Sequence, residues 1–523
     1  MGREKSEGRK VPQGRRKAVS TAGAVRPGGG KAIPASEQAA QLPLFSETAD
    51  SPKGAVAGAD TGRPVPAPSA VPKSETTKRG SLPPMTMEEV TRGYNLKEAF
   101  RQVASNHGAP GADGKTIEQV REHLDEILSR LRSELLAGTY RPGEIRRVWI
   151  AKTGGGQRGL GIPNVIDRIV GQAIAQVMTP HYNPSFHPSS HGFREGRSCH
   201  TAITEAVSHL EAGYDWVVDL DLDSFFDRVP RERLLARLGQ RVQDTRLLGL
   251  IRRMLNAKVV LPDGVVVSTA EGVPQGGPLS PLLSNIVLDE LDWELARRGH
   301  RFVRYADDSN IYVRSERAGR RVMASVTHFI ERRLRLKVNA SKSAVARPEE
   351  RHFLGFRLRR DPLSGDVEVL LSKRSKDRID AKIRELTPRN RGQSLRACIR
   401  RLNAYLRGWL GFFQVISEAG EQTLHWLDAH IRRRLRAIVL KHWKRRRTIV
   451  RRLTRLGVKA LTARVAVYGH NKSWWALSLT RPVNKALSGA YFRERDLLSL
   501  KERWRDLRDQ SVIGPIQLSL DLG

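Results

Sequence analysis

The stretch RFVRYADDSNIYVRS (residues 301–315) places two adjacent acids, Asp307 and Asp308, between two short apolar runs. The alternation of apolar and polar residues on each side predicts two β-strands, and the acids lie where these strands would turn back as a hairpin. Aspartate is a common turn residue, so the pair alone indicates no more than a polar turn. A second acidic segment elsewhere in the chain changes that interpretation.

This second segment is VVDLDLDSFF (residues 217–226), in which acids alternate with aliphatic residues. While such a chain is extended, Asp219, Asp221 and Asp223 share one face. Gathered carboxylates repel and raise one another's pKa unless a cation is bound, and Mg²⁺ suits such a site because it completes its shell with water and phosphate oxygens. Two such ions, about 3.5–4 Å apart, clamp both oxygens of a phosphoryl transfer. The two acidic strand ends predict such a centre, although spacing alone does not distinguish Asp219 from Asp221.

The chain is strongly basic, because 91 of its 523 residues are Lys or Arg against 55 Asp or Glu, for a formal net charge of +36. This charge predicts a polyanionic partner, and nucleic acid is favoured. No run of about 18 apolar residues is present to span a membrane, and no apolar segment typical of a secretory signal follows the charged N-terminus. Two cysteines, Cys199 and Cys398, are too few for a disulfide framework or a four-cysteine zinc site. We therefore expect an intracellular protein without a membrane partner.

Composition and periodicity divide the chain into regions. Residues 1–85 contain too little apolar surface to form a core, which predicts a disordered basic tail. Mixed helix and strand patterns follow up to about residue 370, and basic helices continue from there to the end. The expected elements are helices at 86–106 and 116–140, a hairpin at 144–163, a helix from 165 that ends at Pro180, a strand, turn and helix at 214–238, a loop and helix at 273–299, the hairpin at 301–315, a helix at 322–336, a hairpin at 352–371 and basic helices at 396–414 and 431–456.

Several motifs, in order, resemble those of reverse transcriptases, and in particular the reverse transcriptase/maturases encoded by bacterial group II introns. The motifs are IAKTGGGQRGLGIP (150–163), DLDSFFD (221–227), GVPQGGPLSPLLSNI (272–286), RYADD (304–308) and HFLGFRL (352–358), the last similar to a primer grip. The resemblance covers roughly residues 90–510. It implies a right-hand polymerase of α+β class, with fingers and palm at 86–370, an α-helical thumb/maturase domain at 371–460 and a DNA-binding-like region at 461–523.

The same resemblance implies roles for individual residues. Asp221, the carbonyl of Leu222 and Asp307 would hold two Mg²⁺ ions, and Asp308 would be a supporting catalytic acid. The nucleotide-binding residues that the motifs imply are Lys152, Arg158, Phe226, Gln275 and Lys342. Of these, Lys152 and Arg158 flank a Gly-rich turn suited to phosphate oxygens. The others would exclude a ribose 2′-OH (Phe226), contact the template–nucleotide pair (Gln275) and meet the leaving pyrophosphate (Lys342).

The segment PSFHPSSHGFREGRSCHTAI (184–203) contains a set of residues that zinc sites use: His187, His191, Cys199 and His200. Their spacing matches no standard zinc finger, and the segment resembles a loop-to-helix segment of group II enzymes. We therefore do not interpret it as a metal site. We expect Arg194 to organise fingers and palm or to touch the template.

The basic helical region resembles the maturase domain, with the signature RGW at residues 407–409. Leu402, Tyr405, Leu406 and Trp409 recur at the spacing of one helical face, which predicts core packing with the interleaved arginines turned to RNA. The candidate RNA- or DNA-binding residues are Arg194, Arg407, Arg432, Arg433, Lys444, Arg445 and Arg446. The segment at 467–492 resembles the family's DNA-binding tail, and we expect the His-Asn-His endonuclease that many relatives append to be absent.

We therefore expect an RNA-directed DNA polymerase that also binds its group II intron RNA to assist splicing, and that supports mobility by target-primed reverse transcription. Its expected partners are intron RNA, an RNA template with a DNA primer, target DNA and dNTPs, in the bacterial cytoplasm at the nucleoid, with a homodimer as an open alternative. Two other functions stay open. One is a domesticated relative in phage defence or CRISPR adaptation, and the other is a maturase that only assists splicing.

Overall fold

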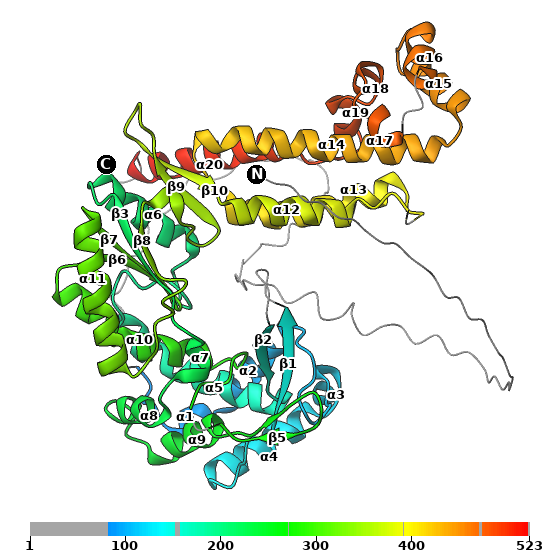
Figure 1. Cartoon of the computed structure of the whole chain (residues 1–523). Helices are drawn as coiled ribbons and strands as arrows, with labels where there is room; N and C mark the ends of the chain where they lie inside the picture. The colour runs from blue at the N-terminus through cyan, green and yellow to red at the C-terminus, as the bar shows by residue number, and fades with distance from the viewer. Residues whose placement is uncertain (1–81, 152–156, 270, 391, 470–472, 521–523) are drawn as a thin grey trace, which may run out of the picture. The chain divides into compact units, whose positions relative to one another are not determined.

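The computed structural model describes residues 82–151, 157–269, 271–390, 392–469 and 473–520 (Figure 1). The predicted tail at residues 1–85 lies outside the described residues except for its last four, so its disorder stays a prediction. No helix in these described ranges has the length and apolar character needed to cross a membrane.

The N-terminal part is helical, but two predicted helices are each divided in two. The elements are α1 (Met87–Val90), α2 (Gly93–Ser105), α3 (Ile117–Glu122), α4 (Leu124–Leu136) and α5 (Val165–Tyr182). α1 ends where the backbone of Arg92 leaves the helical region (φ −56°, ψ 134°), and α3 is separated from α4 at His123. α5 also continues two residues past Pro180, its predicted end. A proline in the last turn removes only one backbone donor, so it does not stop a helix that is already formed.

The predicted hairpin at 144–163 is confirmed as β1 (Ile145–Ala151) and β2 (Gln157–Ile162), which pair antiparallel with Trp149 opposite Gly159. Two strands of two residues each, β4 (Val259–Val260) and β5 (Val266–Val267), extend this sheet beside β1. Sequence periodicity missed them because two residues are too few to show an alternation.

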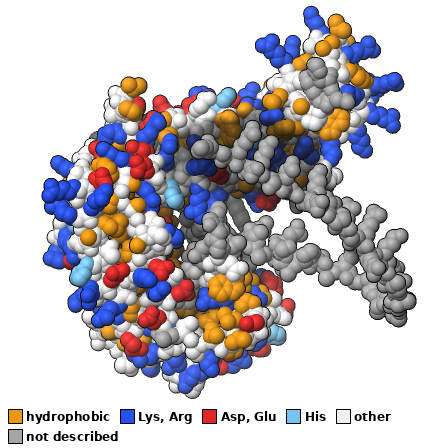
Figure 2. Space-filling view, viewed as in Figure 1, with side chains coloured by type: hydrophobic (Ala, Val, Ile, Leu, Met, Phe, Trp, Pro, Cys, Tyr) orange, Lys and Arg blue, Asp and Glu red, His pale blue; other side chains and the backbone are white. Residues whose placement is uncertain are grey.

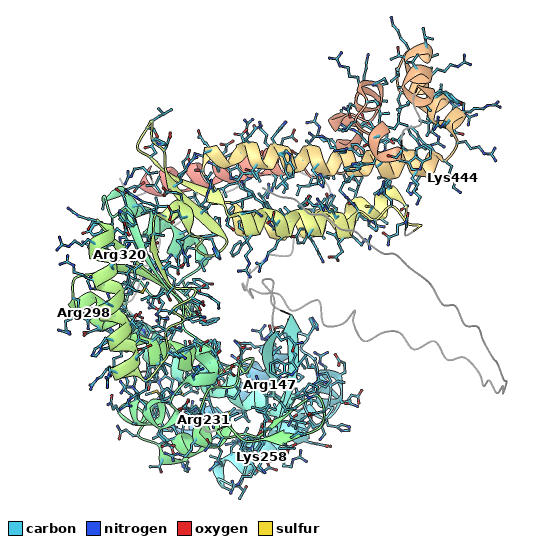
Figure 3. The ribbon with its side chains drawn as sticks, viewed as in Figure 1. Arg147, Arg231, Lys258, Arg298, Arg320 and Lys444 are labelled. Carbon is cyan, nitrogen blue, oxygen red and sulfur yellow. The ribbon has the colours of Figure 1, made fainter. Side chains whose placement is uncertain are left out.

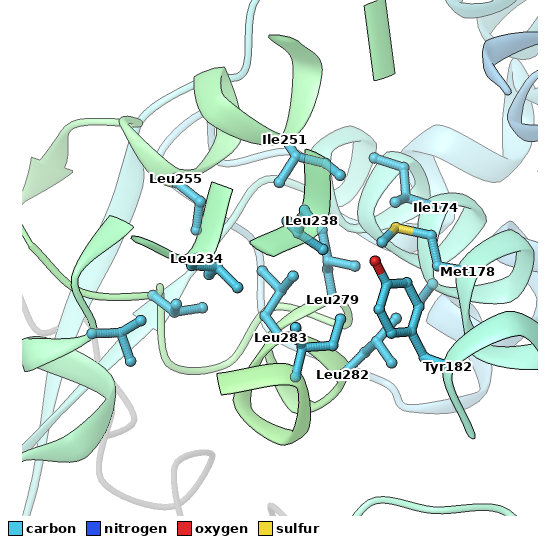
Figure 4. Packing of buried hydrophobic residues seen from close by; sticks show 14 of the residues in the cluster. Ile174, Met178, Tyr182, Leu234, Leu238, Ile251, Leu255, Leu279, Leu282 and Leu283 are labelled. Atoms are coloured by element: carbon cyan, nitrogen blue, oxygen red, sulfur yellow. The ribbon is translucent and has the colours of Figure 1, made fainter. Parts of the chain in front are cut away.

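One apolar core joins these helices to the centre of the chain. The helices that complete it are α7 (Phe225–Arg228), α8 (Arg231–Gly239), α9 (Thr245–Leu255) and α10 (Ser280–Arg297). Figure 4 shows Met178 of α5 packing near Leu238 of α8, Ile251 of α9 and Leu282 of α10. Burying a side chain of this size stabilises the fold by about 1.5–3 kcal/mol. This core supports the loop that runs from α9 to α10.

The central sheet has the strand order β6-β7-β3-β8. Its strands are β3 (Trp216–Leu220), β6 (Arg301–Tyr305), β7 (Asp308–Val313) and β8 (Ala344–Ala346), and its helices are α6 (Cys199–Glu211) and α11 (Glu316–Phe329), the latter extended by a π-helical turn (Ile330–Leu334). Alternation along β3 sends Val217 and Val218 into different apolar clusters. On the Val218 side, Gly319 lets α11 approach closely, because a Cβ there would lie 2.4 Å from the Val345 side chain.

The C-terminal part contains a hairpin and a set of helices. They are β9 (Phe356–Arg360), β10 (Val367–Leu371), α12 (Lys373–Leu386), α13 (Leu395–Phe413), α14 (Glu421–Trp443), α15 (Arg446–Arg455), α16 (Ala460–Tyr468), α17 (Trp474–Leu477), α18 (Arg481–Ala486), α19 (Gly489–Arg493) and α20 (Leu500–Leu520). The prediction of one helix over 431–456 is wrong. The backbone of Lys444 has a φ of +55°, and the Arg445 N–H donates to the Trp443 carbonyl at 2.7 Å, so α14 and α15 are separate helices.

Candidate active site

The two acidic strand ends of the sequence meet at one end of the central sheet. β3 and β7 pair antiparallel with Leu220 opposite Ser309. Asp221 directly follows the end of β3, Asp307 directly precedes β7, and Asp308 is the first residue of β7. Because the end of one strand lies beside the start of its antiparallel neighbour, the predicted acids share one edge.

The turn that carries Asp307 has an unusual backbone conformation, which neighbouring segments hold in place. Tyr305 pairs with Asp308 across a two-residue turn, and Ala306 has a φ of +56°, which is uncommon for a residue with a side chain. Gly192 passes against this turn, because a Cβ at Gly192 would lie 2.2 Å from the Ala306 nitrogen. The segment before α6 thus supports the turn, and position 192 admits only glycine without displacing it.

Arg304 fixes the same turn from inside the protein. Its side chain and that of Asp292 are fully buried, and the guanidinium donates to both carboxylate oxygens of Asp292, at 2.7 and 2.5 Å. It also donates to the Ala306 carbonyl at 2.8 Å and to the Ser190 hydroxyl at 2.6 Å. A buried arginine with this set of acceptors connects α10, the segment before α6 and the acidic turn.

The acids differ in their partners. Arg351 donates to Asp219 from two nitrogens, at 2.8 and 2.5 Å, and also to the Lys342 carbonyl at 2.7 Å. Asp221 instead contacts the Lys342 ammonium at 3.2 Å, and its backbone N–H donates to the Ser343 hydroxyl at 3.0 Å. The Asp219 carboxylate therefore forms an ion pair with an arginine, whereas the Asp221 carboxylate contacts a lysine. This difference distinguishes the two acids, which the sequence spacing alone could not do.

The edge of the sheet is unfavourable for negative charge. Burial, followed by the charges of Asp307, Asp219 and Asp221, raises the pKa of Asp308 to about 7. Asp308 as a whole residue is exposed, and the neighbouring carboxylates of Asp307, Asp219 and Asp221 oppose its ionisation. Burial also raises the pKa of Asp219, although Arg351 opposes the shift. A cation at this edge would relieve the repulsion.

Within the part of the chain that the structure describes, no three His, Cys, Asp or Glu side chains gather closely enough to hold a metal ion by themselves. Mg²⁺ does not need such a cage, because it binds through one or two carboxylates and takes the rest of its shell from water and substrate phosphates. Leu222 is buried, and its backbone pairs with Val338. The donor set fits an ion that arrives with its substrate.

Two predicted nucleotide-binding residues lie on segments that the structure joins through backbone contacts. The Val273 N–H donates to the Phe226 carbonyl at 2.7 Å, and the Gly161 N–H of β2 donates to the Gln275 carbonyl at 2.8 Å. Gly276, with a φ of +117°, allows this approach, because a Cβ there would lie 2.5 Å from the Gly161 carbonyl oxygen. The short helix α7, the 272–277 loop and the β1–β2 hairpin therefore form one connected wall.

The remaining phosphate-binding predictions fall at the edge of what is described. Lys152 lies outside the described residues, and Arg158 lies in β2 opposite Ile150 with a side chain that is likewise not described. Arg147, on the paired strand β1, is described: its guanidinium lies 3.9 Å from Asp227 and donates to the Gly159 carbonyl at 3.0 Å (Figure 3).

Sequence reasoning missed Arg231, which organises the loop before Gln275. Arg231 is buried at the start of α8, and it donates to the carbonyls of Gly272 at 2.8 Å and Glu271 at 2.9 Å, as well as to Thr269 (Figure 3). Arg304 and Arg351 were missed as well, and the reason is the same for all three. In a chain with 91 basic residues, no local signal separates a buried arginine from one that faces solvent.

The histidine-rich segment before α6 is held by protein contacts. His191 is buried between Thr201 at 2.8 Å and Glu205 at 2.7 Å, and His200 contacts the Phe412 carbonyl at 2.7 Å. Arg194 donates to Asn183, to the His187 carbonyl and to the Ser190 carbonyl. These contacts fit the expected organising role of Arg194, while its binding to nucleic acid stays a prediction.

The predicted core stripe of the helical region is confirmed. Leu402, Leu406 and Trp409 of α13 are buried, Tyr405 is half-buried and Arg407 is exposed. The other candidate RNA-binding residues lie on α14 and at its junction with α15. Arg432, Arg433 and Arg446 are half-buried, and Lys444 and Arg445 are exposed. Figure 3 labels Lys444 near the end of α14. Figure 2 shows Lys and Arg side chains gathered around α15 and α16.

Comparison with known proteins places these features in a family. A model described as reverse transcriptase (RNA-dependent DNA polymerase) matches residues 150–358, and one described as group II intron, maturase-specific domain matches residues 376–456. Protein YkfC of Escherichia coli (strain K12) is 32% identical over 323 residues, which cover 54% of this chain and 84% of that protein. The group II intron-encoded protein LtrA of Lactococcus lactis subsp. cremoris is 32% identical over 195 residues, which cover 37% of this chain and 32% of LtrA.

The chain thus spans most of YkfC but only about a third of LtrA. A solved chain of a partial Cas6-RT-Cas1--Cas2 complex aligns with 47% of this chain and 42% of its own length, at 24% identity and a TM-score of 0.31, which is too low to bear on function. The matched domains agree with the mixed helix and strand core and the helical C-terminal part. The chain carries an RNA-directed DNA polymerase domain and a maturase domain, and it belongs to the family of reverse transcriptase/maturases encoded by group II introns.

Proposed function

We propose that this protein extends a DNA primer on an RNA template, using two Mg²⁺ ions at the edge shared by β3 and β7. The observation that carries the proposal is the antiparallel pairing that brings Asp221 beside the Asp307–Asp308 turn. Asp221, the Leu222 carbonyl and Asp307 would hold the ions, with Asp308 in support. The ions supply charge stabilisation for the in-line displacement at the α-phosphate of a dNTP.

This chain's own residues have positioning roles in that reaction. Lys342, whose ammonium lies 3.2 Å from Asp221, would meet the leaving pyrophosphate, and Arg351 donates to the Lys342 backbone carbonyl at 2.7 Å. Gln275 would contact the template–nucleotide pair, and Lys152 and Arg158 would bind the triphosphate. The raised pKa of Asp308 supports the proposal. Neighbouring carboxylates favour the protonated form of Asp308, and a bound cation would favour the ionised form instead.

This linkage predicts a pH dependence of stability. Without divalent ions, the free energy of unfolding is expected to fall as the pH rises through about 7, because the pKa of Asp308 is raised from 3.8 to about 7 in the folded state. A raised pKa means that the folded protein holds the proton more tightly, so this contribution is present at low pH and is lost above 7. Thermal unfolding in a chelator at pH 6 and pH 8 measures the change, and Mg²⁺ should reverse it at pH 8. Asp308→Asn should abolish the difference, and an unchanged difference would contradict the assignment.

Phe226 is proposed to exclude ribonucleotides. Its half-buried ring lies edge-on to buried Phe225, with centroids 5.2 Å apart. Phe226→Ala is expected to raise the incorporation of rNTPs relative to dNTPs by about 10-fold or more, because the ring that would collide with a 2′-OH is removed. Single-nucleotide incorporation with each substrate measures the ratio. Tyr94→Ala, an exposed ring on α2, is the control, and equal ratios in the two variants would remove the gate from the proposal.

We also propose that the protein binds its intron RNA and assists splicing. The proposal is supported by the maturase-domain match and by the basic residues on α14, at its junction with α15 and on Arg407. Phosphate contacts release counterions, so such binding weakens as salt rises. Residues 461–523 are proposed to bind target DNA, and the domain limits stated above remain proposals, as does placement at the bacterial nucleoid.

Splicing of the cognate intron at low Mg²⁺ tests the maturase role. The protein is expected to restore splicing, and replacing Lys444, Arg445 and Arg446 by alanine should weaken RNA binding and lower its salt slope by about 2–3. Arg320→Ala, which removes an exposed cation on α11, is the matched control and should leave both unchanged. Splicing that is unaffected by the protein would remove the maturase proposal. Splicing without any primer extension would instead favour a maturase that only assists splicing.

A further inference from the structure

One face of α14 carries aromatic and cationic side chains together. Trp426, His430, Arg433 and Arg434 follow each other at helical spacing. The Trp426 and His430 rings are stacked, with centroids 5.6 Å apart and planes at 11°, and Trp426 remains 55% exposed. His430 in turn contacts Trp475 of α17 edge-on at 6.4 Å. Three rings therefore form a row where α17 lies against α14 (Figure 1).

A cavity of about 120 Å³ lies beside the last ring of this row. Its walls are Arg389, Arg434, Ala437 and Trp475. The lining thus contains two guanidinium groups, an indole and a methyl group, and no acidic side chain. Because Ala437 is small, its position leaves space that a larger apolar residue would fill.

Arg434 is held rigidly at the wall of the cavity. Its Nε donates to the Thr387 hydroxyl at 2.5 Å, and its Nη2 donates to the Thr387 carbonyl at 3.0 Å and the Arg384 carbonyl at 3.2 Å. Its Nη1 has no hydrogen-bond partner among the residues that the structure describes. Burial and then the nearby charges of Arg384 and Arg389 lower the pKa of Arg434, although Asp380, which lies 3.1 Å from His430, opposes the shift. An anion in the cavity would relieve this crowding of cations.

Trp475 is also fixed in place. The Arg433 guanidinium lies over its ring at 3.8 Å from the centroid, and the Arg433 Nε is buried without a hydrogen-bond partner. A cation over one side of an indole holds the ring by electrostatic attraction. Binding a ligand therefore does not have to include the entropic cost of ordering the ring. The site is thus pre-organised on both its aromatic and its cationic sides.

We propose that this cavity binds one unpaired nucleotide of an RNA strand, with the base against Trp475 and the phosphate against Arg434 and Arg389. Unpaired bases of RNA are recognised by stacking on aromatic rings and arginine planes, whereas a continuous duplex offers only backbone to such a site. This inference rests on the proposed binding of intron RNA, and it names the kind of nucleotide that is bound. A free mononucleotide has the same chemistry, so the test separates the two.

The test uses the full-length protein and two RNA hairpins that differ by a single bulged nucleotide, with AMP as a third ligand. Fluorescence anisotropy is measured for the wild type and for Trp475→Ala, Trp475→Phe, Ala437→Leu and Arg389→Ala. We expect tighter binding of the bulged hairpin by the wild type. Trp475→Ala and Ala437→Leu should lower the affinity for the bulged hairpin by about 5- to 150-fold, and they should change the affinity for the fully paired hairpin by less than about 2-fold. Trp475→Phe should retain most of the preference, because it keeps a ring.

Folding is checked for each variant by circular dichroism and thermal unfolding. Arg389 is exposed, so Arg389→Ala keeps the test valid if Ala437→Leu fails to fold, and it should weaken the bulged hairpin more than the paired one. Trp293→Ala on α10 is the control for loss of an exposed ring. Equal weakening of both hairpins would overturn the inference and leave a basic surface only. AMP binding as tight as that of the bulged hairpin would overturn it in favour of a free nucleotide. An unchanged preference for the bulged hairpin in Trp475→Ala and Arg389→Ala would overturn the inference, while the proposed maturase function, which the splicing assay tests, would stand.

Discussion

Asp307→Asn is expected to reduce primer extension on an RNA template by about 10³-fold or more. The substitution keeps the shape of the side chain but removes the charge, and an ion held at the edge of β3 and β7 supplies several kcal/mol of stabilisation to the developing charge. The Arg304 contacts that hold the turn involve the Ala306 carbonyl and not the Asp307 side chain, so the fold should survive. Incorporation of a labelled dNTP on an annealed RNA template and DNA primer measures the effect.

Two further substitutions sharpen this result. Asp221→Asn should be as severe as Asp307→Asn, whereas Asp219→Asn should lose much less activity, because the Asp219 carboxylate is bound to Arg351. Asp223→Asn, which removes an acid that pairs with Arg228 at 3.1 Å, is the matched control. Activity near the wild-type level in Asp307→Asn, or a larger loss in Asp219→Asn than in Asp221→Asn, would show that the site is assigned to the wrong carboxylates.

Arg304→Met is expected to lower the free energy of unfolding by about 3–5 kcal/mol. The reason is that Asp292 is fully buried and would be left as an uncompensated charge. The substitution also removes the hydrogen bond to the Ala306 carbonyl, so primer extension should fall even in the fraction that stays folded. Denaturant unfolding measures the stability, and kinetics at a temperature well below the transition measure the activity.

A double variant separates the two effects. Arg304→Met combined with Asp292→Leu removes both charges, and it should recover a large part of the lost stability. It should not recover activity, since nothing then holds the Ala306 carbonyl. Arg304→Lys keeps the charge but cannot reproduce the several contacts of the planar guanidinium, so it should show an intermediate loss. If the double variant were as unstable as Arg304→Met, the ion pair would not be the cause of the destabilisation.

Much of the candidate site could be predicted from the sequence, because the strands that position it show local patterns of residue types. Alternation around VVDLDLDSFF and RFVRYADDSNIYV predicted three strands with acids at their ends, and the structure has β3, β6 and β7 at those positions. The stripe of Leu402, Leu406 and Trp409 predicted the buried face of α13 in the same way. Each of these signals repeats within one element, so residues a few positions apart suffice to show it.

Helix ends were less predictable where tertiary contacts decide them. The break at Lys444 follows no glycine or proline, and it leaves Ile449 and Leu453 of α15 buried in the core of the helical part. A continuous helix over 431–456 satisfies the local pattern equally well. Packing against other helices, which lie far apart in the sequence, selects the broken form.

The sequence by itself determined which residue types stand at the strand ends, the mixed and helical regions, and the strongly basic character of the chain. Only the tertiary structure decided which acids belong together and which cations serve them. Arg351 pairs with Asp219, Lys342 contacts Asp221, and Arg304 reaches Asp292 from the interior. The physical reason is that periodicity reports on neighbours within one element, whereas the charge partner of a carboxylate is set by which distant segments the sheet pairing brings to the same edge.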